Sequence, residues 1–321
     1  MQTTKLYIYI PTYNRKREIF AQLEVLYDQV EKYKDKVRVI VNDNGSDQGY
    51  YQELKRKYPH DNIQYNQNFG NIEANANIVQ GFLHAKKDEF IWLLSDDELL
   101  NHNSLEYIIK NIDESSDIVL FEKNTRVNNK LIYNYDDQSM DPIDWGQGLI
   151  SAVLIKSNLI QKYLSAGYYY HNSSFPHLAV FLAAARETKD IKYQFLEMDK
   201  VFFLDETKRI SYDAYSMSST GMPWLVDFMH QANQKRFIHG WTHRNGWRMM
   251  AFRKKHPECY VYSRYLIVKY GGVWGYILLI KSWMISLIYP YLLLIKEKIY
   301  QSEDEKKIKF YKKLAKVVGW N

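Results

Sequence analysis

The stretch at residues 90–98, FIWLLSDDE, constrains the fold of this chain more than any other. Five apolar residues run directly into Ser95 and three carboxylates. A short, continuous apolar run is typical of a strand buried on both faces, as in a parallel sheet with helices on either side. Because crowded carboxylates repel one another, Asp96, Asp97 and Glu98 predict a divalent cation at the carboxyl end of a central strand. The alternative is a solvated turn or a first helical turn, where the helix dipole favours acidic residues.

The pattern on either side of this stretch predicts an α/β fold. Runs rich in β-branched and aromatic residues alternate with segments whose apolar residues have helical spacing, and Pro11 is expected to stop the first strand. Such alternation indicates a Rossmann-like, mostly parallel sheet with helices on both faces. The predicted strands are residues 6–10, 37–41, 63–65 and 90–94, and the predicted helices between them are residues 15–33, 50–58 and 72–86.

Three polar turns are expected to meet at one edge of this sheet. They lie at residues 11–14, 42–47 and 95–98, each after a predicted strand. The carboxyl ends of parallel strands share an edge, and the crevice there suits a nucleotide. None of these turns has the glycine-rich sequence of a Rossmann or Walker loop, so a metal is expected to neutralise the phosphates in place of a backbone cradle.

Composition and charge narrow the functional classes. The chain has 321 residues, of which 46% are hydrophobic and 25% charged, as in a globular protein. The single cysteine, Cys259, excludes an intrachain disulfide and a cysteine-based zinc site, and it predicts a cytoplasmic protein. The net charge is +6, and residues 296–321 carry eight lysines against four acidic residues. The rest of the chain is nearly neutral, which predicts no nucleic-acid partner and directs the basic end toward a membrane surface.

Four motifs, in this order, resemble those of the inverting GT-A glycosyltransferases of family 2. They are PTYN at residues 11–14, VNDNGSD at 41–47, NFG at 68–70 with ANAN at 74–77, and LSDD at 94–97. The resemblance covers about residues 4–122. It implies transfer of a sugar from a nucleotide diphosphate sugar, with a UDP-sugar as the expected donor and Mn²⁺ or Mg²⁺ as the cofactor.

The resemblance also implies roles for single residues. Tyr13 would lie against the nucleobase, and Asp43 would accept a hydrogen bond from its ring N–H. Asp96 would lie near the ribose, and Asp97 would hold the metal against the diphosphate. The other expected donor-site residues are Pro11, Asn14, Asn68 and Asn75.

Two departures and two alternatives accompany these roles. Leu94 or Ser95 stands where many family members carry the first Asp of the metal motif, and Asn75 stands where many carry an Arg. Asn14 could instead cap the first helix, and Asn68 could only shape a loop.

Inverting transfer also needs a base that takes the proton of the acceptor hydroxyl. The resembling family usually places an acidic pair before a helix in the second half of the domain. This chain has Phe-Pro-His-Leu at residues 175–178, so His177 is the predicted catalytic base. A capping or structural role for His177 is the alternative, with Glu197 and Asp199 as the reserve candidates for the base.

The predicted domains are a GT-A domain at residues 1–215 and a helical C-terminal region at 216–321. The first domain comprises a nucleotide-binding half, 4–122, and an acceptor half, 123–215. In the C-terminal region, residues 273–295 are apolar except for Lys281. This length could span a bilayer with tilt.

Scattered Trp and Tyr residues, the central Lys281 and an interrupting Pro290 instead favour a helix, or a helical hairpin, in the membrane interface. A buried core helix is the alternative. Residues 303–320 combine lysines with an apolar stripe, which predicts a basic amphipathic tail of the same interfacial kind.

These features predict a glycosyltransferase of polysaccharide biosynthesis, peripherally associated with the inner face of the cell membrane. The expected acceptor is a polyprenyl-linked or surface glycan. A catalytically silent GT-A protein that binds a nucleotide or glycan is the alternative, and the intact Asp43, Asp96 and Asp97 argue against it. A nucleotidyltransferase is disfavoured because the first loop is neither glycine-rich nor basic enough.

Overall fold

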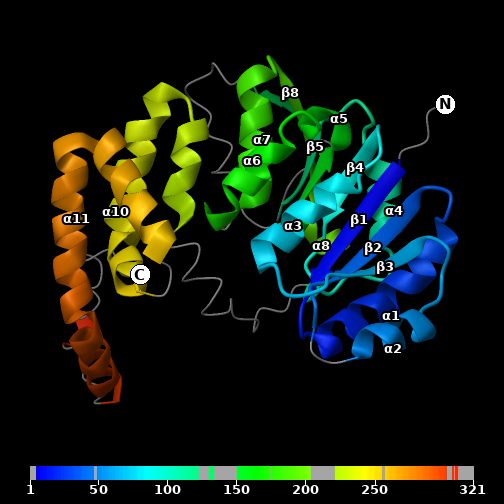
Figure 1. Cartoon of the computed structure of the whole chain (residues 1–321), viewed down its shortest axis with the longest axis horizontal. Coiled ribbons are helices and arrows are strands. Elements are labelled where there is room, and N and C mark those ends of the chain that lie inside the picture. Colours follow the sequence, from blue (N-terminus) through cyan, green and yellow to red (C-terminus); the bar gives the residue numbers. More distant parts are fainter. Residues whose placement is uncertain are drawn as a thin grey trace. The chain divides into compact units, whose positions relative to one another are not determined.

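The computed structural model describes residues 5–46, 49–122, 130–133, 150–173, 175–203, 221–254 and 257–301, together with residues 306, 308 and 309 (Figure 1). The predicted tail at 303–320 therefore lies almost entirely outside the described residues. The chain divides into two compact units, residues 1–171 with 176–208 and residues 172–175 with 209–321. The first unit holds every described strand, and the described part of the second unit is helical.

One eight-stranded sheet forms the centre of the first unit, in the order β3-β2-β1-β4-β7-β5-β8-β6. Strands β7 and β6 run antiparallel to their neighbours, and the others run in a common direction. This mostly parallel sheet confirms the predicted fold class. The strands are β1 (Lys5–Thr12), β2 (Val37–Asp43), β3 (Ile63–Gln67), β4 (Glu89–Leu93), β5 (Ile118–Glu122), β6 (Lys130–Tyr133), β7 (Val153–Lys156) and β8 (Ile191–Glu197).

Helices cover both faces of the sheet (Figure 1). On one face, apolar side chains of α1, α2, α4 and α8 form a continuous core with alternate residues of β1, β2 and β4, such as Ile8 and Trp92. On the other face, α3 lies against Tyr9, and α7 places Phe181 against Tyr193 of β8. The helices of this unit are α1 (Lys16–Lys32), α2 (Tyr50–Lys57), α3 (Ala74–Leu83), α4 (Ser104–Asn111), α5 (Ser157–Ile160), α6 (Leu164–Tyr169), α7 (Pro176–Glu187) and α8 (Met198–Val201).

Strand β4 has the burial that its sequence predicts. All five of its residues are buried, and so is Leu94 directly after it. The one polar group in its apolar run is satisfied, because Trp92 Nε1 donates to the Ser151 carbonyl at 2.8 Å. Burial on both faces therefore continues up to Ser95, where the carboxylates begin.

The prediction that Pro11 stops the first strand is wrong, because β1 continues to Thr12. Thr12 uses its carbonyl toward β2, accepting from Asn44 N, whereas Tyr9 uses its carbonyl toward β4, accepting from Leu94 N. Since backbone groups alternate in direction along a strand, the nitrogen of Pro11 faces β4, which has ended at Leu93. The missing N–H of proline therefore leaves no ladder bond unmade.

The second unit is built on two long helices, α10 (Gln231–Phe252) and α11 (Pro257–Gln301), preceded by the short 3₁₀ segment η4 (Met222–Phe228). Helix α11 consists of two stretches joined at Gly272, whose φ of 58° lies in the left-handed region that glycine tolerates. The second stretch packs closely on α10, where a Cβ on Gly246 would overlap the Ser282 hydroxyl.

The structure differs from the sequence interpretation at Pro290. The helix runs through this residue to Gln301, so Pro290 does not end it. None of the helices within the described ranges combines the length and apolar character that a membrane span requires.

Candidate functional site

The three predicted polar turns meet at one edge of the sheet. Strand β1 lies between β2 and β4 and is parallel to both, so the three carboxyl ends are adjacent. Two contacts join turns that are distant in sequence. Asn14 N donates to Ser46 Oγ at 2.9 Å, and Arg15 Nη1 donates to Asp96 Oδ1 at 2.9 Å. The expected convergence is therefore present.

The turn after β4 is held from two sides. Gln22 of α1 donates its amide to the carbonyl of Ser95 at 2.7 Å and to that of Glu98 at 3.2 Å. Ser95 N in turn donates to Ser151 Oγ at 2.9 Å. The segment is a turn, as the alternative interpretation held, but these bonds fix it and Asp96 is buried within it.

A single arginine bridges the two carboxylates of this turn. Arg15 Nη1 lies 2.9 Å from Asp96 Oδ1 and 3.3 Å from Asp97 Oδ2. The side chain of Asp96 is 4% exposed and that of Asp97 30%. The second oxygen of Asp97, Oδ1, accepts from Ser95 Oγ at 2.6 Å. The turn thus carries two carboxylates and one cation in contact.

Burial sets the ionisation of Asp96. It raises the pKa of this carboxyl group from 3.8 to about 6, although the positive charge of Arg15 acts in the opposite direction. The proximity of Asp97 raises the pKa further because like charges repel. An additional positive charge nearby would therefore stabilise the ionised form of this buried carboxylate.

The donor set at this turn fits a hard divalent cation. Carboxylate oxygens are the ligands that Mg²⁺ and Mn²⁺ prefer. In the portion of the chain that the structure describes, no cluster of three or more His, Cys, Asp and Glu side chains is assembled. Asp96 and Asp97 could therefore supply only part of a coordination shell. The phosphates of a ligand and water would complete it, as is usual for Mg²⁺.

The turn after β2 holds its carboxylate with neutral groups. Asp43 is fully buried. Its Oδ1 accepts from Ser46 Oγ, and its Oδ2 accepts from Gln67 Nε2 at 2.8 Å and from Ser46 N at 3.3 Å. Three bonds occupy most of the roughly four lone-pair directions of a carboxylate. Capacity for about one more donor remains, but because Asp43 is fully buried, side chains around this turn must move before a nucleobase can reach it.

The loop after β3 is fastened to the same turn. Asn68 N donates to the Asp43 carbonyl at 2.8 Å, and Asn68 Nδ2 donates to Asn44 Oδ1 at 2.8 Å. Gly45 has a φ of 74°, and a Cβ there would come within 2.6 Å of the Gly70 backbone. Asn68 therefore shapes this loop, as the alternative interpretation proposed. The fixed loop holds the side chain of Phe69 fully in solvent beside the turn.

The expected residues after β1 lie at the mouth of the site. Pro11 is partly buried at the end of β1, and Tyr13 is 37% exposed. Asn14 adopts a left-handed conformation with a φ of 54°, which asparagine tolerates better than most residues. Arg15 occupies the N-cap position of α1, without a capping bond from its side chain, so the alternative of Asn14 as the helix cap is wrong.

Asn75 lies in the first turn of α3 and is buried. Two residues further along this helix, Asn77 Oδ1 accepts from Asn42 Nδ2 at 2.6 Å, which ties α3 to the end of β2. Among the described residues, no acceptor lies within hydrogen-bonding distance of the buried Nδ2 of Asn75. Leaving a buried donor unsatisfied costs about 1–3 kcal/mol, so a ligand with an acceptor atom would stabilise this position.

His177 lies in the first turn of α7 and is only 1% exposed. Only three residues separate α7 from β8, so the helix must run back along the strand. Its amino end therefore lies toward the carboxyl end of β8, on the same edge as the three turns. Glu197 ends β8 at this edge, paired in register with Glu122 of β5, and is partly exposed; Asp199 is exposed.

The sequence analysis assigns no role to four residues of this edge: Arg15, Ser46, Gln67 and Phe69. Arg15 carried a usable signal, because it directly follows a turn expected to face three carboxylates. The other three depend on side-chain directions that the sequence pattern does not define.

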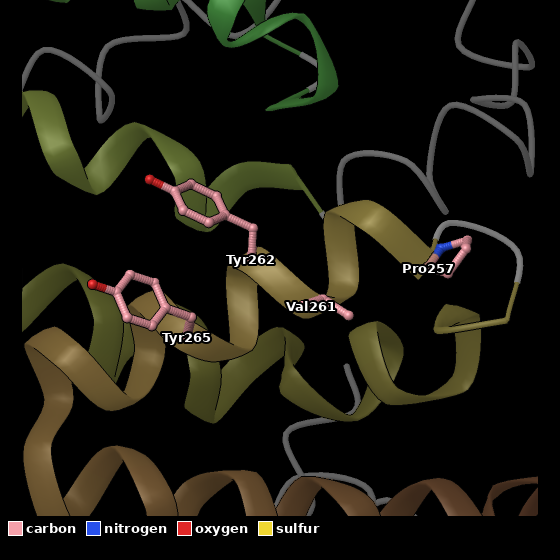
Figure 2. Close-up of a pocket in the computed structure, with 4 residues that line it drawn as sticks. All are labelled: Pro257, Val261, Tyr262 and Tyr265. Carbon is pink, nitrogen blue, oxygen red and sulfur yellow. The ribbon is translucent and has the colours of Figure 1, made fainter.

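A separate apolar hollow lies in the second unit (Figure 2). Pro257, Val261, Tyr262 and Tyr265 line it. The rings of Tyr262 and Tyr265 are stacked with centroids 5.9 Å apart, and Tyr262 donates its hydroxyl to Asp227 Oδ2 at 2.9 Å. These four lining residues include no carboxylate or imidazole, so the sheet edge remains the candidate for chemistry.

Comparison with protein families agrees with the geometry of this edge. The family model described as "Glycosyl transferase family 2" matches residues 7–170, just over half of the chain. The match includes the three turns, the loop after β3 and α3. No curated protein matches the sequence.

Solved structures share the fold at low sequence identity. Residues 1–349 of S. aureus TarS in complex with UDP-GlcNAc superpose with a TM-score of 0.56 at 13% identity, over 90% of this chain and 92% of that chain. A crystal structure of residues 1–349 of S. aureus TarS gives a TM-score of 0.55 at 13% identity with the same coverage. The complex of this fragment with UDP gives 0.53 at 14% identity, again over 90% and 92%.

Proposed function

The chain belongs to glycosyl transferase family 2, and from this premise we propose that it transfers a sugar from a nucleotide diphosphate sugar to a glycan acceptor with inversion at the anomeric carbon. The observation that carries the proposal is the pairing of two acidic turns at one sheet edge. One is the buried, neutrally bonded Asp43, and the other is the Asp96–Asp97 pair with its cation. The two turns suit opposite ends of a nucleoside diphosphate.

The nucleobase is proposed to lie over the β2 turn. Asp43 would accept its ring N–H with the remaining lone pair. Tyr13 and Phe69 flank this turn and offer ring faces, since the segments that carry them are bonded to Ser46 and to the Asp43 carbonyl. An aromatic ring is worth about 1–3 kcal/mol per stacked base. The unsatisfied Nδ2 of Asn75 would donate to the same ligand. UDP is the proposed nucleotide because a TarS structure with the same fold binds UDP.

The diphosphate is proposed to lie at the β4 turn. Asp97 would hold Mn²⁺ or Mg²⁺, and Asp96 would lie near the ribose. The bound cation would stabilise the negative charge of the departing nucleoside diphosphate. Gln22 and Ser95 fix the turn, so the two carboxylates need little rearrangement to bind the cation.

His177 is proposed as the base that deprotonates the acceptor hydroxyl. Its helix begins at the same edge of the sheet as the two acidic turns, but its burial means that neighbouring side chains must move to admit an acceptor. Glu197 is the second candidate because it is partly exposed at the same edge. Replacing the true base should lower the transfer rate about 10²–10⁴-fold without changing donor affinity. Parallel assays of His177→Asn and Glu197→Gln therefore decide between them.

The acceptor is proposed to be lipid-linked, with α11 holding the protein at the inner face of the cell membrane. The second stretch of α11 buries one side, including Gly275, Leu279 and Ser282. Lys281 also turns toward α10, where its Nζ lies 3.5 Å from His243 Nε2. The opposite side exposes a stripe of large apolar residues at helical spacing: Val273, Tyr276, Ile277, Ile280, Trp283, Met284 and Leu287. Such a stripe with aromatic residues suits the membrane interface.

Vesicle sedimentation tests this anchor. The double variant Ile280→Glu/Trp283→Glu places two charges on the exposed stripe and should release the protein from vesicles that contain anionic lipid. Tyr265→Glu is the control, because Tyr265 is equally exposed but lies on the first stretch of α11. If the double variant still sediments like the wild type, this stripe is not the anchor.

A screen of nucleotide sugars tests the activity itself. The wild-type protein should hydrolyse one donor slowly in the absence of acceptor, and EDTA should stop it. Binding of a nucleotide without any turnover, with every acceptor tried, would instead support the alternative of a non-catalytic GT-A binding protein.

A further inference from the structure

The further inference concerns Arg15, whose position in the site no sequence motif assigned. One nitrogen of its guanidinium contacts a carboxylate oxygen of both Asp96 and Asp97. An arginine in this position holds together two acidic groups that would otherwise repel each other.

Arg15 also stands where a metal would bind. The two oxygens of Asp97 have different partners, and Oδ1 accepts a hydrogen bond from Ser95 Oγ at 2.6 Å. Oδ2 is the atom that Arg15 approaches to 3.3 Å. A divalent cation binds a carboxylate oxygen at about 2.0–2.6 Å. Two positive groups on one oxygen would repel each other strongly at such distances.

The arginine has room to leave. Its side chain is 43% exposed, whereas that of Asp96 is 4% exposed, so the guanidinium can rotate toward solvent while the carboxylates stay in place. The diphosphate of a donor would lie on this open side, against the metal. A guanidinium binds phosphate oxygens with two parallel hydrogen bonds, which makes this a favourable destination.

We propose that Arg15 is an exchangeable counter-ion: it bridges Asp96 and Asp97 in the free protein, yields Asp97 to the divalent cation, and then binds the donor diphosphate. The proposal rests on the proposed function, because it requires a metal and a nucleoside diphosphate at this edge. It assigns to one residue two effects of opposite sign, a weaker affinity for the metal alone and a stronger affinity for the metal-bound nucleotide.

Titrations of the full-length protein with Mn²⁺ alone test the first effect, followed by Mn²⁺ paramagnetic resonance or calorimetry. They are made at pH 8, above the pKa of about 6 for Asp96. Arg15→Gln should bind Mn²⁺ about three- to tenfold more tightly than the wild type, since the competing charge is gone. Arg17→Gln is the matched control, because it removes the same charge from an exposed position on α1, and it should bind like the wild type.

Calorimetric titrations with UDP at saturating Mn²⁺ test the second effect. Arg15→Gln should bind UDP at least about tenfold more weakly, whereas its affinity for uridine, which has no phosphate, should not change. Arg15→Lys should fall between the wild type and Arg15→Gln. A thermal-unfolding curve for each variant confirms that the fold is retained.

Three results would overturn the proposal. If Arg15→Gln binds both Mn²⁺ and UDP more weakly, the arginine only positions the carboxylates. If it binds both like the wild type, the arginine has no part in the exchange, while the proposed function stands. If the wild type binds neither Mn²⁺ nor any nucleoside diphosphate, the inference and the proposed function fail together.

Discussion

The two acidic turns at the edge of the sheet stabilise their buried carboxylates in different ways. Asp43, after β2, is stabilised by neutral donors from Ser46 and Gln67. Asp96 and Asp97, after β4, are stabilised by the charge of Arg15. Neutral hydrogen bonds fix a direction, which suits recognition of a base edge. A counter-ion that can move neutralises the carboxylates without fixing a direction, which suits a turn where a metal and phosphates take its place. This difference indicates that the β2 turn binds the base of a nucleotide and that the β4 turn binds its diphosphate.

The largest expected effect belongs to the β4 turn. Asp97→Ala should abolish transfer while the protein stays folded, because the charge of the diphosphate would no longer be neutralised through the metal. Transfer assays with the donor found by screening provide the measurement. Asp61→Ala, at an exposed acidic residue just before β3, is the control. Full activity of Asp97→Ala, or wild-type activity in EDTA, would rule out the metal-dependent account.

The next effect belongs to the β2 turn. Asp43→Ala should weaken binding of UDP by about 1–3 kcal/mol, the cost of losing a charged hydrogen-bond partner. The comparison predicts that this loss is the same with Mn²⁺ and with EDTA, since Asp43 does not contact the metal. Calorimetry under both conditions measures it. An unchanged affinity would remove Asp43 from the nucleotide site.

The smallest effect concerns stability and its dependence on pH. The pKa of Asp96 is raised to about 6 in the folded protein, so its contribution to folding is fully present below pH 3.8 and is lost as the pH rises through about 6. At pH 8 the buried charge of Asp96 therefore lowers the free energy of unfolding by about 1–3 kcal/mol. Asp96→Asn should raise the unfolding midpoint at pH 8 by a few degrees and raise it less at pH 5. A midpoint that falls at pH 8 would show that the pair with Arg15 outweighs burial.

The sequence predicts the frame of this site better than its contacts. The apolar run before Ser95 is sufficient to predict that β4 is a central strand, because only a strand with neighbours on both sides and helices on both faces buries all of its side chains. The parallel arrangement then brings Asp43, Asp96 and Asp97 to one edge. These conclusions depend on pattern and topology, which the sequence contains.

The contacts depend on geometry that the pattern does not contain. The bridge from Arg15 to the two carboxylates directly follows Asn14, whose left-handed φ of 54° no sequence pattern indicates. The sequence predicts that Pro11 ends β1. The strand nevertheless continues, because β4 stops before it would need a hydrogen bond from the residue at position 11, and the sequence does not show where β4 stops. Pro290 was expected to interrupt α11, yet the helix continues through it.

One set of titrations tests the central claim most directly, namely that the two turns bind opposite ends of a nucleoside diphosphate. UDP is titrated into the wild type, Asp43→Ala and Asp97→Ala, each with Mn²⁺ and with EDTA. The account predicts that EDTA weakens binding by the wild type and by Asp43→Ala, and that Asp97→Ala binds equally weakly under both conditions. Equal binding by all three proteins, whether or not Mn²⁺ is present, would contradict it.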